Sequence, residues 1–150
     1  MFPQESVIPE ALISYIAGLK THDVELIGST FADDIEFVTS AKTMKKEQIL
    51  DFLAALYRGF PDWKYDHDEP VVTKEGEFGV KWRQGGTHTD HLEFPGFEGV
   101  APTGKTVVIP EHFFYYKVVE NKLTEIRPDP IPGGAPRGIF EQIGVDVPPL

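Results

Sequence analysis

The sequence predicts a single α+β domain in which helices come first and antiparallel strands follow. Three observations support this prediction. Apolar residues recur at helical spacing over residues 8–56, runs of strand length occupy residues 63–127, and no internal repeat divides the chain. A length of 150 residues with 41% hydrophobic residues suffices for one buried core, so residues 1–150 are expected to fold as one domain.

The first predicted helix begins near Pro9, because proline suits the first turn of a helix. Its apolar stripe consists of Ile8, Leu12, Ile16 and Leu19. This stripe is expected to pack against the sheet.

Two more helices and a short strand are expected before residue 62. Asp23 is expected to cap a second, short helix. Residues 35–39 alternate apolar and polar side chains, which predicts a strand. Thr43 is expected to cap a third helix, which ends at the breakers Gly59 and Pro61.

The second half is expected to form an antiparallel meander. The runs WKYDHDEPVVT and EFGVKWRQGGTHT are predicted as two strands joined by a turn at Gly76, and GKTVVIPEHFFYYKVV as a third. The dipeptide EN turns this third strand into KLTEIR. Pro110 lies inside the third strand and requires a bulge or an edge position, because proline lacks a backbone donor. RGIFEQIG is predicted as a short helix that stops at Gly144.

Composition excludes several classes of function. Acidic residues outnumber basic ones by 24 to 14, and the formal charge of −10 disfavours both nucleic acids and anionic membranes as partners. The absence of cysteine excludes disulfides, thiolate zinc sites and a cysteine nucleophile. The N-terminus has no recognisable signal peptide or membrane span, so a cytoplasmic protein is expected.

Three stretches of the second half resemble one known family. They are GGTHTDHL (85–92), APTGKTVVI (101–109), and ENKLTEIR followed by GIFEQIG (120–144). In order and spacing they are similar to the SnoaL-like polyketide cyclases, a branch of the NTF2-like superfamily. The resemblance implies a cone-shaped barrel with a hydrophobic cavity between a curved sheet and helices. It also implies a homodimer and an activity that needs no cofactor.

The resemblance also implies candidate catalytic residues. In these cyclases an Asp late in the last strand exchanges a proton during an aldol ring closure, assisted by a His on the preceding strand. Alignment through ENKL places the Asp position at Pro128, beside Asp129, and the His position at Phe114, two residues after His112. We therefore take Asp129 as the candidate general acid/base and His112 as its partner. Alternation puts His112 on the same face as Phe114, whereas Asp129 reaches that face only if Pro128 introduces a bulge.

Further residues are candidates for ligand contacts. They are Phe114, Tyr116, His88, Trp82 and Arg127. Each candidate also has a structural alternative: Asp129 could begin a turn or pair with Arg127, and His112 could be a satisfied core histidine. His88 and His91 lie three positions apart, which puts them on opposite faces of a strand, so no metal site is expected.

Three functions remain open at this point. The first is a cofactor-independent cyclase or isomerase that binds a small hydrophobic carbonyl compound, such as a polyketide-like or steroid-like ligand, with Asp129 as the acid/base. The second is a non-catalytic module for ligand binding or dimerisation, because fold alone does not decide activity. The third is a hydrolase of the limonene epoxide type, for which Arg127 and Asp129 would supply part of an Asp-Arg-Asp relay.

Overall fold

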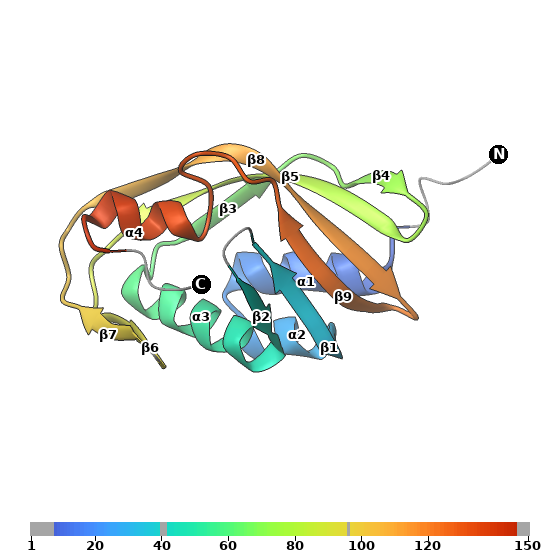
Figure 1. Ribbon diagram of the computed structural model, residues 1–150, viewed down its shortest axis with the longest axis horizontal. Coiled ribbons are helices and arrows are strands. Elements are labelled where there is room, and N and C mark those ends of the chain that lie inside the picture. The colour runs from blue at the N-terminus through green and yellow to red at the C-terminus, as the bar shows by residue number, and fades with distance from the viewer. Residues whose placement is uncertain (1–7, 40–41, 96, 147–150) are drawn as a thin grey trace.

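The computed structural model describes residues 8–39, 42–95 and 97–146 and confirms the predicted α+β fold (Figure 1). The helices of these residues are α1 (Glu10–Thr21), α2 (Val24–Ser29), α3 (Lys46–Gly59) and α4 (Arg137–Ile143). The strands are β1 (Phe31–Val38), β2 (Thr43–Lys45), β3 (Lys64–His67), β4 (Val71–Lys74), β5 (Glu77–Thr87), β6 (Leu92–Phe94), β7 (Phe97–Val100), β8 (Thr106–Val119) and β9 (Lys122–Pro128).

Seven strands form one curved sheet in the order β2-β1-β9-β8-β5-β3, with β4 also paired to β5. The pair β5 and β8 forms the long centre of this sheet and extends from Glu77, opposite Lys117, to Thr87, opposite Thr106. The neighbours are antiparallel except β1 and β9, which run parallel. Strands β6 and β7 form a separate hairpin. The helices α1, α2 and α3 cover one side of the curved sheet (Figure 1).

Helix α1 has the predicted apolar stripe, and its N-terminus is attached to the turn between β8 and β9. Its buried face includes Leu12, Ile16 and Leu19. The side chain of Asn121, in the turn between β8 and β9, accepts a hydrogen bond of 2.9 Å from the backbone of Ala11. This bond satisfies one of the amides left free at the helix N-terminus.

The predicted start of the third helix is wrong. Thr43 belongs to β2, where it pairs with Val38 of β1, because a β-branched side chain fits a strand. Helix α3 begins at Lys46, and the Gln48 side chain accepts a 2.9 Å hydrogen bond from the backbone of Lys45. The predicted cap Asp23 is confirmed, since its carboxylate accepts a hydrogen bond of 3.0 Å from the backbone N–H of Leu26.

The strands differ from the prediction in three ways. Strand β1 begins at Phe31 rather than at residue 35, because its first residues pair with β9. The run WKYDHDEPVVT forms two strands, β3 and β4, that are separated by residues 68–70. The hairpin β6–β7 was not predicted, since its strands have only three and four residues.

The prediction of a bulge at Pro110 is confirmed. Trp82 pairs with His112 and Gln84 pairs with Ile109, which leaves Pro110 and Glu111 opposite a single residue of β5. The strand that carries Pro110 lies between β5 and β9, so the bulge rather than an edge position accommodates the proline.

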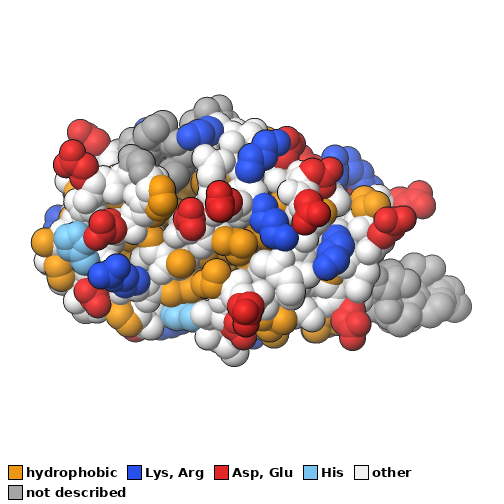
Figure 2. Space-filling view, turned by 90° about the horizontal axis from the view of Figure 1, so that it is seen from below, with side chains coloured by type: hydrophobic (Ala, Val, Ile, Leu, Met, Phe, Trp, Pro, Cys, Tyr) orange, Lys and Arg blue, Asp and Glu red, His pale blue; other side chains and the backbone are white. Residues whose placement is uncertain are grey.

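The buried core fills the space between the sheet and the helices. Its largest fully buried side chains include Trp82, Tyr116, Phe60 and Phe140. Acidic and basic side chains are interspersed on the face shown in Figure 2, around a group of hydrophobic side chains. None of the described helices is long and apolar enough to span a membrane.

Candidate functional site

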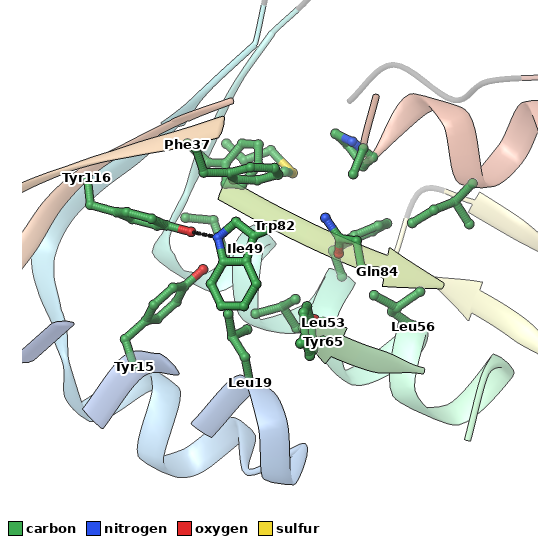
Figure 3. Close-up of a pocket in the computed structure, with 16 residues that line it drawn as sticks. Tyr15, Leu19, Phe37, Ile49, Leu53, Leu56, Tyr65, Trp82, Gln84 and Tyr116 are labelled. Atoms are coloured by element: carbon green, nitrogen blue, oxygen red, sulfur yellow. Dashed lines mark hydrogen bonds between the residues drawn. The ribbon is translucent and has the colours of Figure 1, made fainter. Parts of the chain in front are cut away.

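An apolar cavity lies between the curved sheet and the helices (Figure 3). Helices α1 and α3, strands β1, β2, β3, β5 and β8, and the segment around α4 all contribute side chains to its wall. The cavity volume open to the centre of a water molecule is about 50 Å³, and the empty space between the lining atoms, with the open solvent at the mouth included, is about 570 Å³. No Asp, Glu, Lys, Arg or His is found among the described side chains that line it. The cavity is therefore suited to an uncharged, largely hydrophobic molecule.

Two tyrosines and a tryptophan place polar atoms inside this apolar wall. The Trp82 indole N–H donates a hydrogen bond of 2.8 Å to the Tyr116 hydroxyl. Burial raises the pKa of Tyr15 well above its ordinary value, and the neighbouring Tyr116 hydroxyl opposes this rise only in part. The hydroxyls of Tyr15 and Tyr116 both point toward Trp82 (Figure 3). Both phenols are therefore protonated at neutral pH.

The direction of the hydrogen bond to Trp82 leaves the phenol donors free. An indole N–H can only donate, so the Tyr116 hydroxyl accepts from Trp82 and its own hydrogen stays available. No hydrogen bond to a described residue occupies the Tyr15 hydroxyl (Figure 3), so its O–H is available as well. The cavity therefore offers phenol O–H groups to a ligand oxygen.

A second phenol pair lies next to the first. The hydroxyls of Tyr57 and Tyr65 are 2.7 Å apart, and burial raises the pKa of both. Tyr65 lines the cavity, whereas Tyr57 stacks on His22 with ring centroids 4.1 Å apart. One O–H of this pair donates to the other hydroxyl, which holds the two rings in place, and the accepting hydroxyl keeps its own hydrogen.

The structure brings three of the predicted ligand-contact residues to the cavity. They are Trp82, Phe114 and Tyr116. They share one face of the β5–β8 centre of the sheet, as alternation along the strands requires.

His112 lies on this same face but behind the cavity wall. Its Nδ1 is 2.8 Å from the Pro110 carbonyl oxygen and must donate there, because a carbonyl can only accept. The neutral ring then has an unprotonated Nε2, which is buried and has no hydrogen-bond partner in the described residues. Gly134 lies next to Nε2, and the adjacent residues Ala135 and Pro136 line the cavity.

His88 is not at the cavity but holds a loop. Its Nδ1 accepts a hydrogen bond of 3.2 Å from the backbone of Thr103 and lies 2.9 Å from the Thr103 hydroxyl. The ring stacks on Phe60, and burial lowers the pKa of His88. No group of His, Asp and Glu side chains that could hold a metal ion occurs in the described part of the chain.

Asp129 and Arg127 lie on the outer face of the sheet, so the expectation that Asp129 faces the cavity is not met. Pro128 is the residue that pairs with Phe114 on the inner face. One position further, Asp129 faces outward, and its carboxylate is 3.4 Å from the Tyr115 hydroxyl. Arg127 stacks over the Tyr115 ring at 5.0 Å and pairs with the buried Glu77 at 3.3 Å. Pro128 introduces no bulge that would turn the acid inward.

Two residues of the site were missed in the sequence. Tyr15 lies within the apolar stripe of α1, between Leu12 and Leu19, so the helical periodicity could have indicated that it faces inward. Gln84 lies two positions after Trp82, on the same strand face, and lines the cavity. Alternation along β5 was the signal that could have found it.

Comparison with known proteins agrees with this architecture. The proposed hydroxylase AclR from Streptomyces galilaeus has a similar structure, with a TM-score of 0.64, 18% identity, and coverage of 79% of this chain and 75% of AclR. A proposed SnoaL-like polyketide cyclase from Jannaschia sp. CCS1 is similar with a TM-score of 0.63 and 19% identity, and the match covers 82% of this chain and 87% of the cyclase. TerC, which was crystallised with polyporic acid, is similar with a TM-score of 0.62 and 16% identity, and the match covers 89% of this chain and 95% of TerC.

The helix-covered curved sheet has the NTF2-like fold, because the chain is also similar to an NTF2-like protein from Cytophaga hutchinsonii ATCC 33406, with a TM-score of 0.56, 11% identity, and coverage of 87% of this chain and 92% of that protein. Within that class the chain belongs to the SnoaL-like domain family, whose model matches residues 12–126. A sequence search of the curated proteins found no match.

Proposed function

We propose that the protein binds a small, uncharged, hydrophobic carbonyl compound and promotes its enolisation as a cofactor-independent enzyme of the cyclase or isomerase type. The observation that supports this proposal is the free O–H of Tyr15 in a cavity without charged side chains. A phenol donor in such a place stabilises the negative charge that develops on a carbonyl oxygen when a neighbouring carbon loses a proton.

His112 is the candidate for the group that takes this proton. Its Nε2 has a free lone pair, and its tautomer is fixed by the bond to Pro110. In the proposed reaction Nε2 removes a proton from the α-carbon while the electron pair moves to the carbonyl oxygen at Tyr15. In an isomerisation, Nε2 returns the proton to another carbon of the enolate. In a ring closure, the enolate carbon bonds to a second carbonyl carbon, and the oxygen of that carbonyl takes the proton from Nε2. Access to Nε2 requires the segment from Gly134 to Pro136 to move away from the ring.

A non-catalytic binding module is the second candidate. It is favoured by one observation: none of the described side chains that line the cavity is a carboxylate or an imidazole. The positions of the acid and the histidine in the related cyclases hold Pro128 and Phe114, a facing pair without titratable groups. The hydrolase alternative has less support, since Arg127 and Asp129 both lie on the outer face.

The bicyclic ketone 1-tetralone is a suitable probe for both candidates. Binding is measured by isothermal titration calorimetry, and enolisation by NMR as exchange of the α-protons with D₂O above the buffer rate. We expect Tyr15→Phe to weaken binding about 2- to 12-fold, the value of one hydrogen bond, and to slow exchange further. His112→Gln should abolish exchange while leaving binding within about 2-fold, since the ring does not line the cavity.

Asp129→Asn is the matched control on the outer face and should change neither measurement. Binding without any exchange above the buffer rate would support the non-catalytic module and overturn the enzyme. Absence of binding would overturn both candidates.

A further inference from the structure

Gln84 is the only residue with a polar, non-aromatic side chain among those described as lining the cavity. It lies on β5, two positions after Trp82, and pairs with Tyr65 of β3 on one side and Ile109 of β8 on the other. The bulge of β8 at Pro110 and Glu111 lies directly beside it. Gln84 is therefore held at a fixed place in the sheet, with its side chain on the cavity face.

The amide of Gln84 forms no side-chain hydrogen bond with the described residues, and two nearby hydroxyls have other partners. The Tyr65 hydroxyl is occupied by Tyr57, and the Tyr116 hydroxyl is occupied by Trp82. A primary amide has two donor hydrogens and one acceptor oxygen, and none of them is committed to a described residue. Gln84 is half-buried, so water satisfies these groups until a ligand with a matching polar group takes its place.

The amide and the Tyr15 hydroxyl lie at different ends of the cavity. In Figure 3 the pair Tyr15 and Tyr116 lies on one side of the Trp82 indole, and Gln84 lies on the other. The side chains that lie between them in Figure 3 are hydrophobic or aromatic, among them Trp82 and Leu53. A bound molecule thus meets a hydrogen-bond donor at one end, an apolar middle, and an amide at the other end.

We propose that Gln84 is a specificity-determining residue, which selects ligands that carry a second oxygen function, a hydroxyl or a carbonyl, on the side remote from the carbonyl held by Tyr15. This inference rests on the proposed function, because it takes the Tyr15 end as the place of the first carbonyl. The selected class is a flat, uncharged ring ketone with a remote hydroxyl. An amide suits such a hydroxyl, since it can accept its hydrogen and also donate to its oxygen.

The test compares 1-tetralone with 6-hydroxy-1-tetralone, which adds one hydroxyl at the far side of the same ring system. Binding of both is measured by calorimetry at pH 6, for the wild-type protein and for Gln84→Met. Methionine keeps the length of the side chain and removes the amide. Thermal unfolding of the variant confirms that it is folded, and its affinity for 1-tetralone serves as the internal control.

The wild-type protein should bind the hydroxylated ketone about 2- to 12-fold more tightly, and Gln84→Met should lose this preference while binding 1-tetralone at least as well. If wild type binds both ketones equally, or if the preference persists in Gln84→Met, the role of Gln84 is overturned while the proposed function stands. If wild type binds neither ketone, the proposed function fails, and the role of Gln84 fails with it.

Discussion

The hydrogen bond between Trp82 and Tyr116 can be tested through the stability of the fold. Both side chains are buried, with exposed fractions of 2% and 0%, and the indole N–H has the Tyr116 hydroxyl as its partner at 2.8 Å. Tyr116→Phe removes that acceptor and leaves the N–H buried and unpaired, which costs about 1–3 kcal/mol of unfolding free energy. At roughly 2–4 °C per kcal/mol for a chain of this length, a loss near 2 kcal/mol lowers the Tm by about 4–8 °C.

The neighbouring Tyr115 provides the matched control for this experiment. It has the same chemistry on the same strand but faces outward, where its hydroxyl makes only a long contact of 3.4 Å with Asp129. Urea unfolding should show Tyr115→Phe within about 0.5 kcal/mol of wild type. In the background of Trp82→Phe, the substitution Tyr116→Phe should cost clearly less, because no N–H is left without a partner. Equal losses for the two tyrosines, or no coupling with Trp82, would refute the reasoning.

Two further predictions concern stability elsewhere in the fold. Burial opposes the ionisation of Glu77, but hydrogen bonds from Thr73 and Arg127 outweigh it and lower the pKa of Glu77. A carboxyl whose pKa is lowered in the folded state stabilises that state above about pH 4.5, and this contribution is lost as the pH falls through the pKa of the folded state. The stability advantage of wild type over Glu77→Gln should therefore shrink between pH 7 and pH 3. A difference in unfolding free energy that stays constant over this range, measured by urea unfolding, would contradict this prediction. A Cβ on Gly138 would lie 2.0 Å from the Gly133 carbonyl oxygen, so Gly138→Ala should destabilise α4 by about 1–3 kcal/mol or more. Gly28→Ala, whose Cβ would meet only a flexible leucine side chain at 3.2 Å, should unfold much closer to wild type, and similar Tm values for these two variants would count against the steric argument.

The fold was predictable from the sequence where local signals agree with the tertiary arrangement. The stripe of α1 and the long strands β5 and β8 carry clear periodicity, so their existence followed from pattern alone. The start of α3 was not predictable in the same way. Thr43 has the chemistry of a helix cap, but pairing with Val38 of β1 recruits it into a strand, and that partner is chosen by tertiary structure.

The candidate site also depends on tertiary structure that local sequence patterns do not reveal. Resemblance and alternation indicated the inner face of β8, where Phe114 and Tyr116 line the cavity, and Trp82 lines it from the neighbouring strand β5. Whether the Asp129 side chain points inward or outward depends on whether Pro128 forms a bulge. The register of β8 with β9 decides this, and the sequence alone does not reveal that register. Tyr15 comes from a helix far away in the chain, so no local motif connects it with Trp82 and Tyr116.

The attachment of the first helix and strand to the last strand has a consequence for folding kinetics. Asn121 reaches the start of α1 across 110 positions of the chain, and Lys122 reaches the carbonyl of Ser29 across 93. Such contacts form only after a long segment of chain has closed into a loop, which lowers the conformational entropy of the chain. This loss comes before the parallel pairing of β1 with β9 can stabilise the fold. We therefore expect the docking of the N-terminal helices onto the meander to be the slow step of folding, so that the chamber they enclose is assembled late.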